Sequence, residues 1–209
     1  LAIDPNGIAT QYDYFPTTGY LQRVTQDPSA LNAVTAFTYD NFGYLDQVTD
    51  AENHTTNYDF NELGWLIEER SPLSFRTQYS YDKNGNVEEI ERQANGQATQ
   101  WQTTSFTHDI LNHLKTVTDP LNRVTTLNYD NNENMTSVVD AGNKTTAYQY
   151  DERDLLFRTL DANSTQGITQ YDYDINGNLA KIIDANAHAT DYALTGGLFS
   201  RSPSHIEQA

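Results

Sequence analysis

Two short segments carry the oxygen-rich side chains that bind calcium in many proteins. They are Asp82-Lys83-Asn84-Gly85-Asn86 and Asp174-Ile175-Asn176-Gly177-Asn178. The EF-hand calcium loop has a different spacing and ends in a bidentate Glu, which neither segment has. Elsewhere in the chain, the same place holds Asp-x-x-Gly without the extra Asn. Both segments are therefore predicted to be hairpin turns, and no metal site is expected.

No catalytic constellation stands out from the remaining polar residues. The sequence contains no HExxH, GxSxG or P-loop motif, and it has no cysteine for thiol chemistry or zinc–thiolate sites. Abundant Asp and Glu could form a glycosidase-like pair by chance, but no pair is singled out. We expect no catalytic residue, no cofactor site and no enzymatic activity. An enzyme with carboxylate catalysis on its surface ranks last among the function classes.

The two tryptophans are the candidate ligand contacts. Trp65 follows a tight turn, and Trp101 is expected to lie in a loop formed by the longest insertion of the chain. An exposed Trp can stack on a sugar or contact a partner protein. Local packing is the alternative for both residues, and the binding interpretation is stronger for Trp101 because its segment departs from the surrounding pattern.

The charge of the chain excludes some partners. The 209 residues include 29 Asp and Glu against 12 Lys and Arg, which gives a formal charge of −17. Such a surface repels the phosphates of nucleic acids and anionic lipids. No run of about 18 apolar residues could span a membrane. We therefore expect no nucleic-acid partner and no membrane span.

A repeated motif organises these residues. Threonines recur at a basic period of 21 residues, at Thr10, Thr35, Thr56, Thr77, Thr104, Thr125, Thr146, Thr169 and Thr190. An aromatic residue usually follows at the second and fourth positions after each Thr, as at Tyr58 and Phe60 after Thr56. Alternate residues lie on one face of a β-strand, so each motif predicts a strand with one apolar face.

A turn and a second strand follow each motif. Asp40 and Gly43 open and close one such turn, which suits the hydrogen bonding of Asp and the positive φ of Gly. An apolar residue such as Leu45 then begins a second strand, and a second turn leads to the next Thr. Nearly all variation in length falls in this second connection. Each unit is thus a β-hairpin, and successive hairpins pair in one long antiparallel sheet that must twist and curl.

This pattern resembles the YD repeats of Rhs proteins, Tc-toxin C components, bacterial wall-associated proteins and teneurins. The motif is carried by Tyr79-Ser80-Tyr81-Asp82-Lys83-Asn84-Gly85-Asn86-Val87 and by the segment from Thr38 to Asp50. The resemblance implies an all-β fold, a spiral sheet that wraps into a hollow shell. It covers about eight hairpin units within residues 1–195, and residues 196–209 are expected to be a degraded repeat end or tail.

The resemblance also implies a function and its setting. We expect a non-catalytic segment of a shell that encloses a C-terminal toxin or other cargo in a large secreted or cell-surface protein. Its partners would be adjacent repeats of a longer parent chain and the enclosed polypeptide. A module that binds carbohydrate or another cell surface, with Trp65 or Trp101 as contact, is the alternative.

Overall fold

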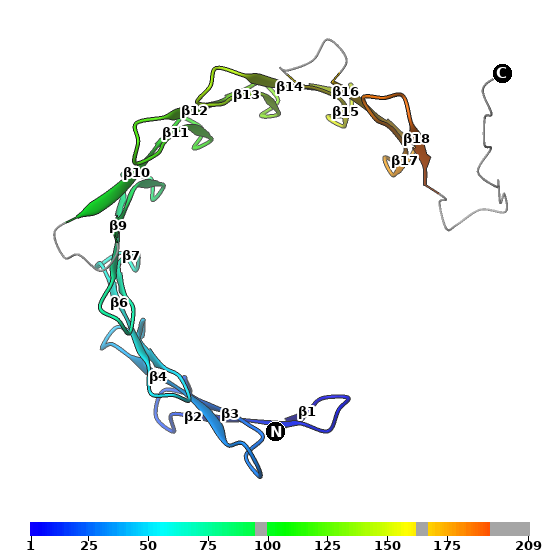
Figure 1. Cartoon of the computed structure of the whole chain (residues 1–209). Helices are drawn as coiled ribbons and strands as arrows, with labels where there is room; N and C mark the ends of the chain where they lie inside the picture. The colour runs from blue at the N-terminus through cyan, green and yellow to red at the C-terminus, as the bar shows by residue number, and fades with distance from the viewer. Residues whose placement is uncertain (95–99, 162–166, 193–209) are drawn as a thin grey trace. The chain divides into compact units, whose positions relative to one another are not determined.

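The computed structural model describes residues 1–94, 100–161 and 167–192. Within these ranges the chain forms 18 β-strands and no helix (Figure 1), which confirms the all-β prediction. The chain divides into two compact units, Leu1–Phe106 and Thr107–Ala209, and each is described by itself. The expected tail, residues 196–209, lies outside the described residues.

The first unit consists of a series of hairpins. Its strands are β1 (Ala2–Ile3), β2 (Ala9–Tyr14), β3 (Leu21–Gln26), β4 (Ala33–Tyr39), β5 (Leu45–Thr49), β6 (Thr55–Phe60), β7 (Leu66–Arg70), β8 (Arg76–Tyr81), β9 (Val87–Gln93) and most of β10 (Trp101–His108).

The second unit repeats the same arrangement. Its strands are β11 (Leu114–Thr118), β12 (Val124–Tyr129), β13 (Met135–Val139), β14 (Thr145–Tyr150), β15 (Leu156–Leu160), β16 (Ile168–Tyr173), β17 (Leu179–Ile183) and β18 (Ala189–Asp191).

Within each unit, strands that follow one another in sequence pair antiparallel. In the hairpin of β6 and β7, Tyr58 pairs with Glu69 and Asp59 with Glu68. The register then shifts by one residue, so that Phe60 pairs with Leu66 beside the turn. The same shift recurs in the hairpins β2–β3, β4–β5, β8–β9, β12–β13, β14–β15 and β16–β17. This bulge places the second aromatic of each motif opposite the apolar residue that begins the next strand.

The register separates an aromatic face from a polar face. On the aromatic face, Phe37 pairs with Val48 in the first unit and Tyr171 pairs with Ile182 in the second. The alternate residues form the polar face, where Asp59 is opposite Glu68. The predicted strand with one apolar face is therefore confirmed in both units, because side chains along a strand alternate between faces.

Neither unit has a buried apolar core. Each is a single layer of strands (Figure 1), and no apolar side chain among the described residues is buried. Of the residues that the structure describes, only Thr25 and Glu68 are buried, with 6% and 8% of their surface exposed. No helix in the described part of the chain is long and apolar enough to cross a membrane. Contacts between neighbouring hairpins must therefore supply most of the stability.

Candidate functional site

The tight turns of the hairpins have a repeated hydrogen-bond geometry. The carboxylate of Asp40 accepts hydrogen bonds from the backbone N–H groups of Phe42 and Tyr44, at 2.8 and 2.9 Å. The N–H of Asp40 in turn donates to the carbonyl of Tyr44, at 2.9 Å. The fourth residue, Gly43, has a φ of 91°, which favours glycine. An acidic residue thus satisfies the backbone of its own turn.

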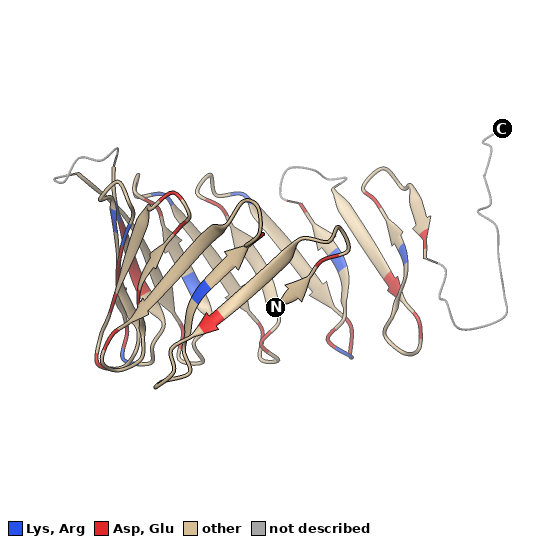
Figure 2. Ribbon diagram, turned by 90° about the horizontal axis from the view of Figure 1, so that it is seen from below, with Lys and Arg blue, Asp and Glu red and all other residues tan. Residues whose placement is uncertain are grey.

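Several second connections have the same geometry as the tight turns. Asp119 accepts from the N–H groups of Leu121 and Arg123, and Asn122 takes the positive φ. The segment Asp119-Pro120-Leu121-Asn122 is thus one of the second turns that the repeat pattern predicts. Turns therefore alternate between two opposite margins of each unit, where many of the acidic residues lie (Figure 2).

The segments that resemble calcium loops are turns of this kind. In the segment that begins at Asp174, the carboxylate accepts from the N–H groups of Asn176 and Asn178 and from the side-chain amide of Asn178, at 3.0 Å. The hydrogen bond from the side-chain amide of Asn178 is the main cause of the lowered pKa of Asp174. No group of three or more His, Asp or Glu within the described ranges is arranged to hold a metal ion. The hairpin-turn prediction is confirmed.

Tyrosine hydroxyl groups connect successive hairpins. The hydroxyl of Tyr81 donates to the carbonyl oxygen of Leu66, which lies in the preceding hairpin, at 2.7 Å. Tyr150 makes the same bond to the carbonyl of Met135 at 3.0 Å. Tyr129 and Tyr173 do so as well, to Leu114 and Leu156. Partial burial raises the pKa of Tyr81, so the hydroxyl keeps its proton and remains a donor.

Aromatic rings form a second link between hairpins. The rings of Tyr44 and Phe60 stack with their centroids 5.3 Å apart, and those of Trp65 and Tyr81 lie 5.2 Å apart. In each pair, the first residue follows a tight turn and the second belongs to the next hairpin. Trp65 is therefore half-buried against its neighbour, as the local-packing interpretation expected.

One of these links is ionisable. The ring of His113 stacks on Tyr129 at 4.8 Å, and its Nδ1 lies 3.0 Å from Oδ2 of Asp109. Its Nε2 lies 3.4 Å from Oε2 of Glu133, in the next turn. The hydrogen bond with Asp109 and the charges of both carboxylates raise the pKa of His113. A protonated His113 would bridge two acidic turns.

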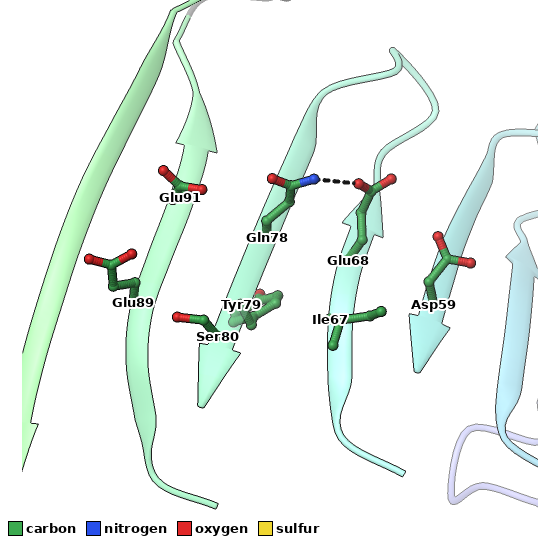
Figure 3. A pocket seen from close by; sticks show the side chains of 8 residues that line it. All are labelled: Asp59, Ile67, Glu68, Gln78, Tyr79, Ser80, Glu89 and Glu91. Carbon is green, nitrogen blue, oxygen red and sulfur yellow. Dashed lines mark hydrogen bonds between the residues drawn. The ribbon is translucent and has the colours of Figure 1, made fainter. Parts of the chain in front are cut away.

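The polar face of the first unit has an acidic depression between β6 and β9 (Figure 3). Glu68 is one of its lining residues, and the side-chain amide of Gln78 donates to the Glu68 carboxylate at 2.8 Å. Arg70 and Arg76 form ion pairs with the same carboxylate. Partial burial opposes ionisation of Glu68, but the bonds from Gln78 and Arg70 outweigh it and lower the pKa. Glu68 therefore has partners within the sheet.

Trp101 lies in a strand and not in an insertion loop. It is the first residue of β10 and pairs with Gln93, so the expectation that it belongs to a loop was wrong. The extra residues allow β9 and β10 to extend, since both strands are longer than most in the chain. Trp101 shares the polar face with Thr103 and Glu91, which are joined by a 3.3 Å hydrogen bond. A ligand role for Trp101 or Trp65 stays a prediction.

Comparison with known proteins identifies the class of this fold. The family model of the Teneurin YD-shell matches residues 70–200. The chain belongs to this family, and the resemblance to YD repeats is confirmed. Among curated proteins, none matches this sequence.

Solved structures show the same fold over most of the chain. A crystal structure of TcdB2-TccC3 with Cdc42 has a TM-score of 0.65 and 13% identity, over 86% of this chain and 12% of that one. TcdB2-TccC3 without its hypervariable C-terminal region has a TM-score of 0.64 and 12% identity, over 86% and 12%. The Tc holotoxin pore of Photorhabdus luminescens has a TM-score of 0.60 and 12% identity, over 90% and 12%. This chain spans about an eighth of the length of those chains.

Proposed function

We propose that this chain is a wall segment of a β-shell in a larger Rhs-like protein, and that the shell encloses a C-terminal toxin or other polypeptide. The segment itself has no catalytic role. The parent protein would be secreted or exposed at a cell surface, and its partners would be neighbouring repeats and the enclosed polypeptide. Family membership and the fold shared with TcdB2-TccC3 support this assignment.

The single observation that carries the proposal is the absence of a core within the described residues. Each unit is one layer whose apolar side chains are all at least partly exposed. A domain normally buries an apolar sheet face against a second layer. A layer that leaves this face free is suited to be a wall that meets something outside itself, either another part of the shell or its contents.

The test is to purify the native parent protein and compare its intact mass and peptide map before and after denaturation. A much longer chain, with a cleaved C-terminal piece that stays associated until the protein is denatured, would support the proposal. Limited proteolysis should spare that piece in the native protein and degrade it afterwards. A native product of about 209 residues, or a C-terminal piece that is digested in both states, would contradict it.

Carbohydrate binding on the polar face is the second candidate. The placement of Trp101 favours it, because an aromatic ring beside the hydrogen-bonding groups of Gln93, Thr103 and Glu91 is the chemistry that sugar sites use. A glycan array probed with the chain would test it. Signal lost in Trp101→Ala but kept in Gln102→Ala, whose side chain lies on the opposite face, would support binding. No signal, or equal signal in both variants, would remove this candidate.

A further inference from the structure

Successive tight turns meet through a specific pair of residues. We call the residue directly after a tight turn the post-turn residue, and the fourth residue of a turn the glycine position. In the first unit, each post-turn aromatic lies against the glycine position of the next turn. The pairs are Tyr20 with Gly43, Tyr44 with Gly64, and Trp65 with Gly85.

These contacts leave little room for a side chain at the glycine position. A Cβ atom on Gly64 would lie 2.6 Å from the hydroxyl oxygen of Tyr44, and one on Gly85 would lie 3.0 Å from Cζ2 of Trp65. Both distances are shorter than ordinary van der Waals contact, and each ring is held by the next hairpin, Tyr44 by Phe60 and Trp65 by Tyr81. A Cβ on Gly64 would have to displace the Tyr44 hydroxyl, and one on Gly85 would require Trp65 to move by a few tenths of an ångström. Glycine is thus favoured there by space as well as by its positive φ.

The second unit contains the opposite combination. His113 faces Glu133, and the side-chain amide of Asn134 donates to Oδ1 of Asp154 at 2.7 Å. Glu133 and Asp154 have φ values of 70° and 59°, although such backbone favours glycine. A charged side chain at a strained position is thus matched by a polar neighbour that binds it. Where the post-turn residue is Leu155, the next glycine position is Gly177. A Cβ atom on Gly177 would lie 3.6 Å from Cδ1 of Leu155, which is ordinary contact.

We propose that these pairs are a recognition rule between successive hairpins. A large aromatic post-turn residue accepts a following hairpin only if the glycine position of that hairpin is glycine. A polar post-turn residue accepts a following turn with a polar or acidic residue there. The partner that this surface fits is thus a hairpin of defined turn sequence. Near-identical hairpins could otherwise pair out of order, and a steric clash against the wrong neighbour is an effective means of specificity.

A substitution that keeps the backbone preference can isolate the steric part of the rule. Asn tolerates positive φ and already takes it at Asn112 and Asn122. Gly85→Asn should therefore act mainly through its clash with Trp65. We expect amide hydrogen exchange in β7, β8 and the Gly85 turn to accelerate about tenfold or more. The matched control is Gly177→Asn, because Gly177 faces Leu155 at ordinary contact distance. This substitution should change amide hydrogen exchange in the Gly177 turn by less than about threefold.

A second pair of variants decides the outcome. Trp65→Asn places at this post-turn position the residue found at Asn134 and Asn178. In the Trp65→Asn background, Gly85→Asn should accelerate amide hydrogen exchange in the same segments by about threefold or less. The converse test is His113→Trp, which should be tolerated better together with Glu133→Gly than alone. An equal effect of Gly85→Asn with and without Trp65 would overturn the rule, as would an equal effect at Gly177. If Gly85→Asn does not fold, a folded double variant supports the rule and an unfolded one overturns it.

Discussion

At the scale of single residues, the acidity of the chain has a structural cause. Asp opens most turns, and its carboxylate accepts two backbone N–H bonds within the turn, as at Asp119 and Asp184. These bonds favour the charged form. The side chain of Arg123 and then the turn backbone lower the pKa of Asp119, and the backbone N–H of His188 is the main cause of the lowered pKa of Asp184. Much of the negative charge of the chain therefore belongs to carboxylates that accept hydrogen bonds from the turn backbone.

His113 gives a pH-dependent prediction at this scale. Its pKa is raised in the fold, mainly by its hydrogen bond with Asp109. The stabilisation is then fully present below the unfolded value of about 6.5 and is lost as pH rises through the folded pKa. We expect the turns around Asp109 and Glu133 to exchange faster at pH 8 than at pH 6, after correction for intrinsic rates. An NMR titration should find the His113 pKa above that of a free histidine.

The control for this prediction is His113→Asn, which places at this position the residue found at Asn134. The variant should lose the pH dependence between about pH 6 and 8, because Asn does not titrate. A pKa of His113 at or below 6.5, or an unchanged pH dependence in the variant, would contradict the bridging role of this side chain.

At the scale of elements, the hairpin is joined to its neighbours by two kinds of link. The second aromatic of each motif lies opposite the apolar residue beside its own turn. Four of these aromatics also bond to the preceding hairpin through their hydroxyl groups: Tyr81, Tyr129, Tyr150 and Tyr173. The post-turn residue packs in the other direction, on the following hairpin. Each hairpin thus holds both neighbours at the tight-turn margin. The bulge makes this possible because it turns the second aromatic toward the turn.

The tyrosine link predicts a measurable loss. Tyr150→Phe removes only the hydroxyl that donates to the carbonyl of Met135. A hydrogen bond of this type contributes about 0.5–1.5 kcal/mol, so the variant should be less stable by about 1 kcal/mol. Denaturant titration with Tyr148→Phe as the matched control would measure it. Equal losses in the two variants would show that the hydroxyl bond between hairpins contributes no special stability.

At the largest scale, each unit is a linear series of neighbour contacts. Within each unit, every described strand pairs with the strands next to it in sequence, and no apolar side chain within the described ranges is buried. Stability in such an array is a sum of local terms, and perturbations should decay with distance along the series. This distinguishes a wall of hairpins from a globular domain with one cooperative core.

The corresponding prediction concerns how far damage spreads. Phe37→Ala in β4 removes a half-buried ring opposite Val48. We expect hydrogen exchange to accelerate in β3, β4 and β5, while β8 and β9 in the same unit change little. Peptide-resolved exchange by mass spectrometry would show this pattern. Uniform loss of protection throughout residues 1–94 would indicate one cooperative unit and contradict the linear description.

The sequence by itself determined the strands, their faces and the family. Threonines and aromatics at alternate positions predict a strand with one apolar face, and Asp40 followed by Gly43 predicts a turn, because these preferences act within a few residues. The regular period then implied hairpins in series. The YD-repeat motif carried the family assignment, which the family comparison confirmed over residues 70–200.

The tertiary structure decided which residues meet across hairpins. The bond from Tyr81 to Leu66, the ring of Trp65 over Gly85 and the bridge from His113 to Glu133 join residues 15 to 20 positions apart. The bulge before each tight turn sets these contacts by shifting the register by one residue, and no local propensity specifies that shift. The position of Trp101 was also predicted wrongly. Its pairing with Gln93 joins β9 and β10, and only the folded sheet brings these two residues together.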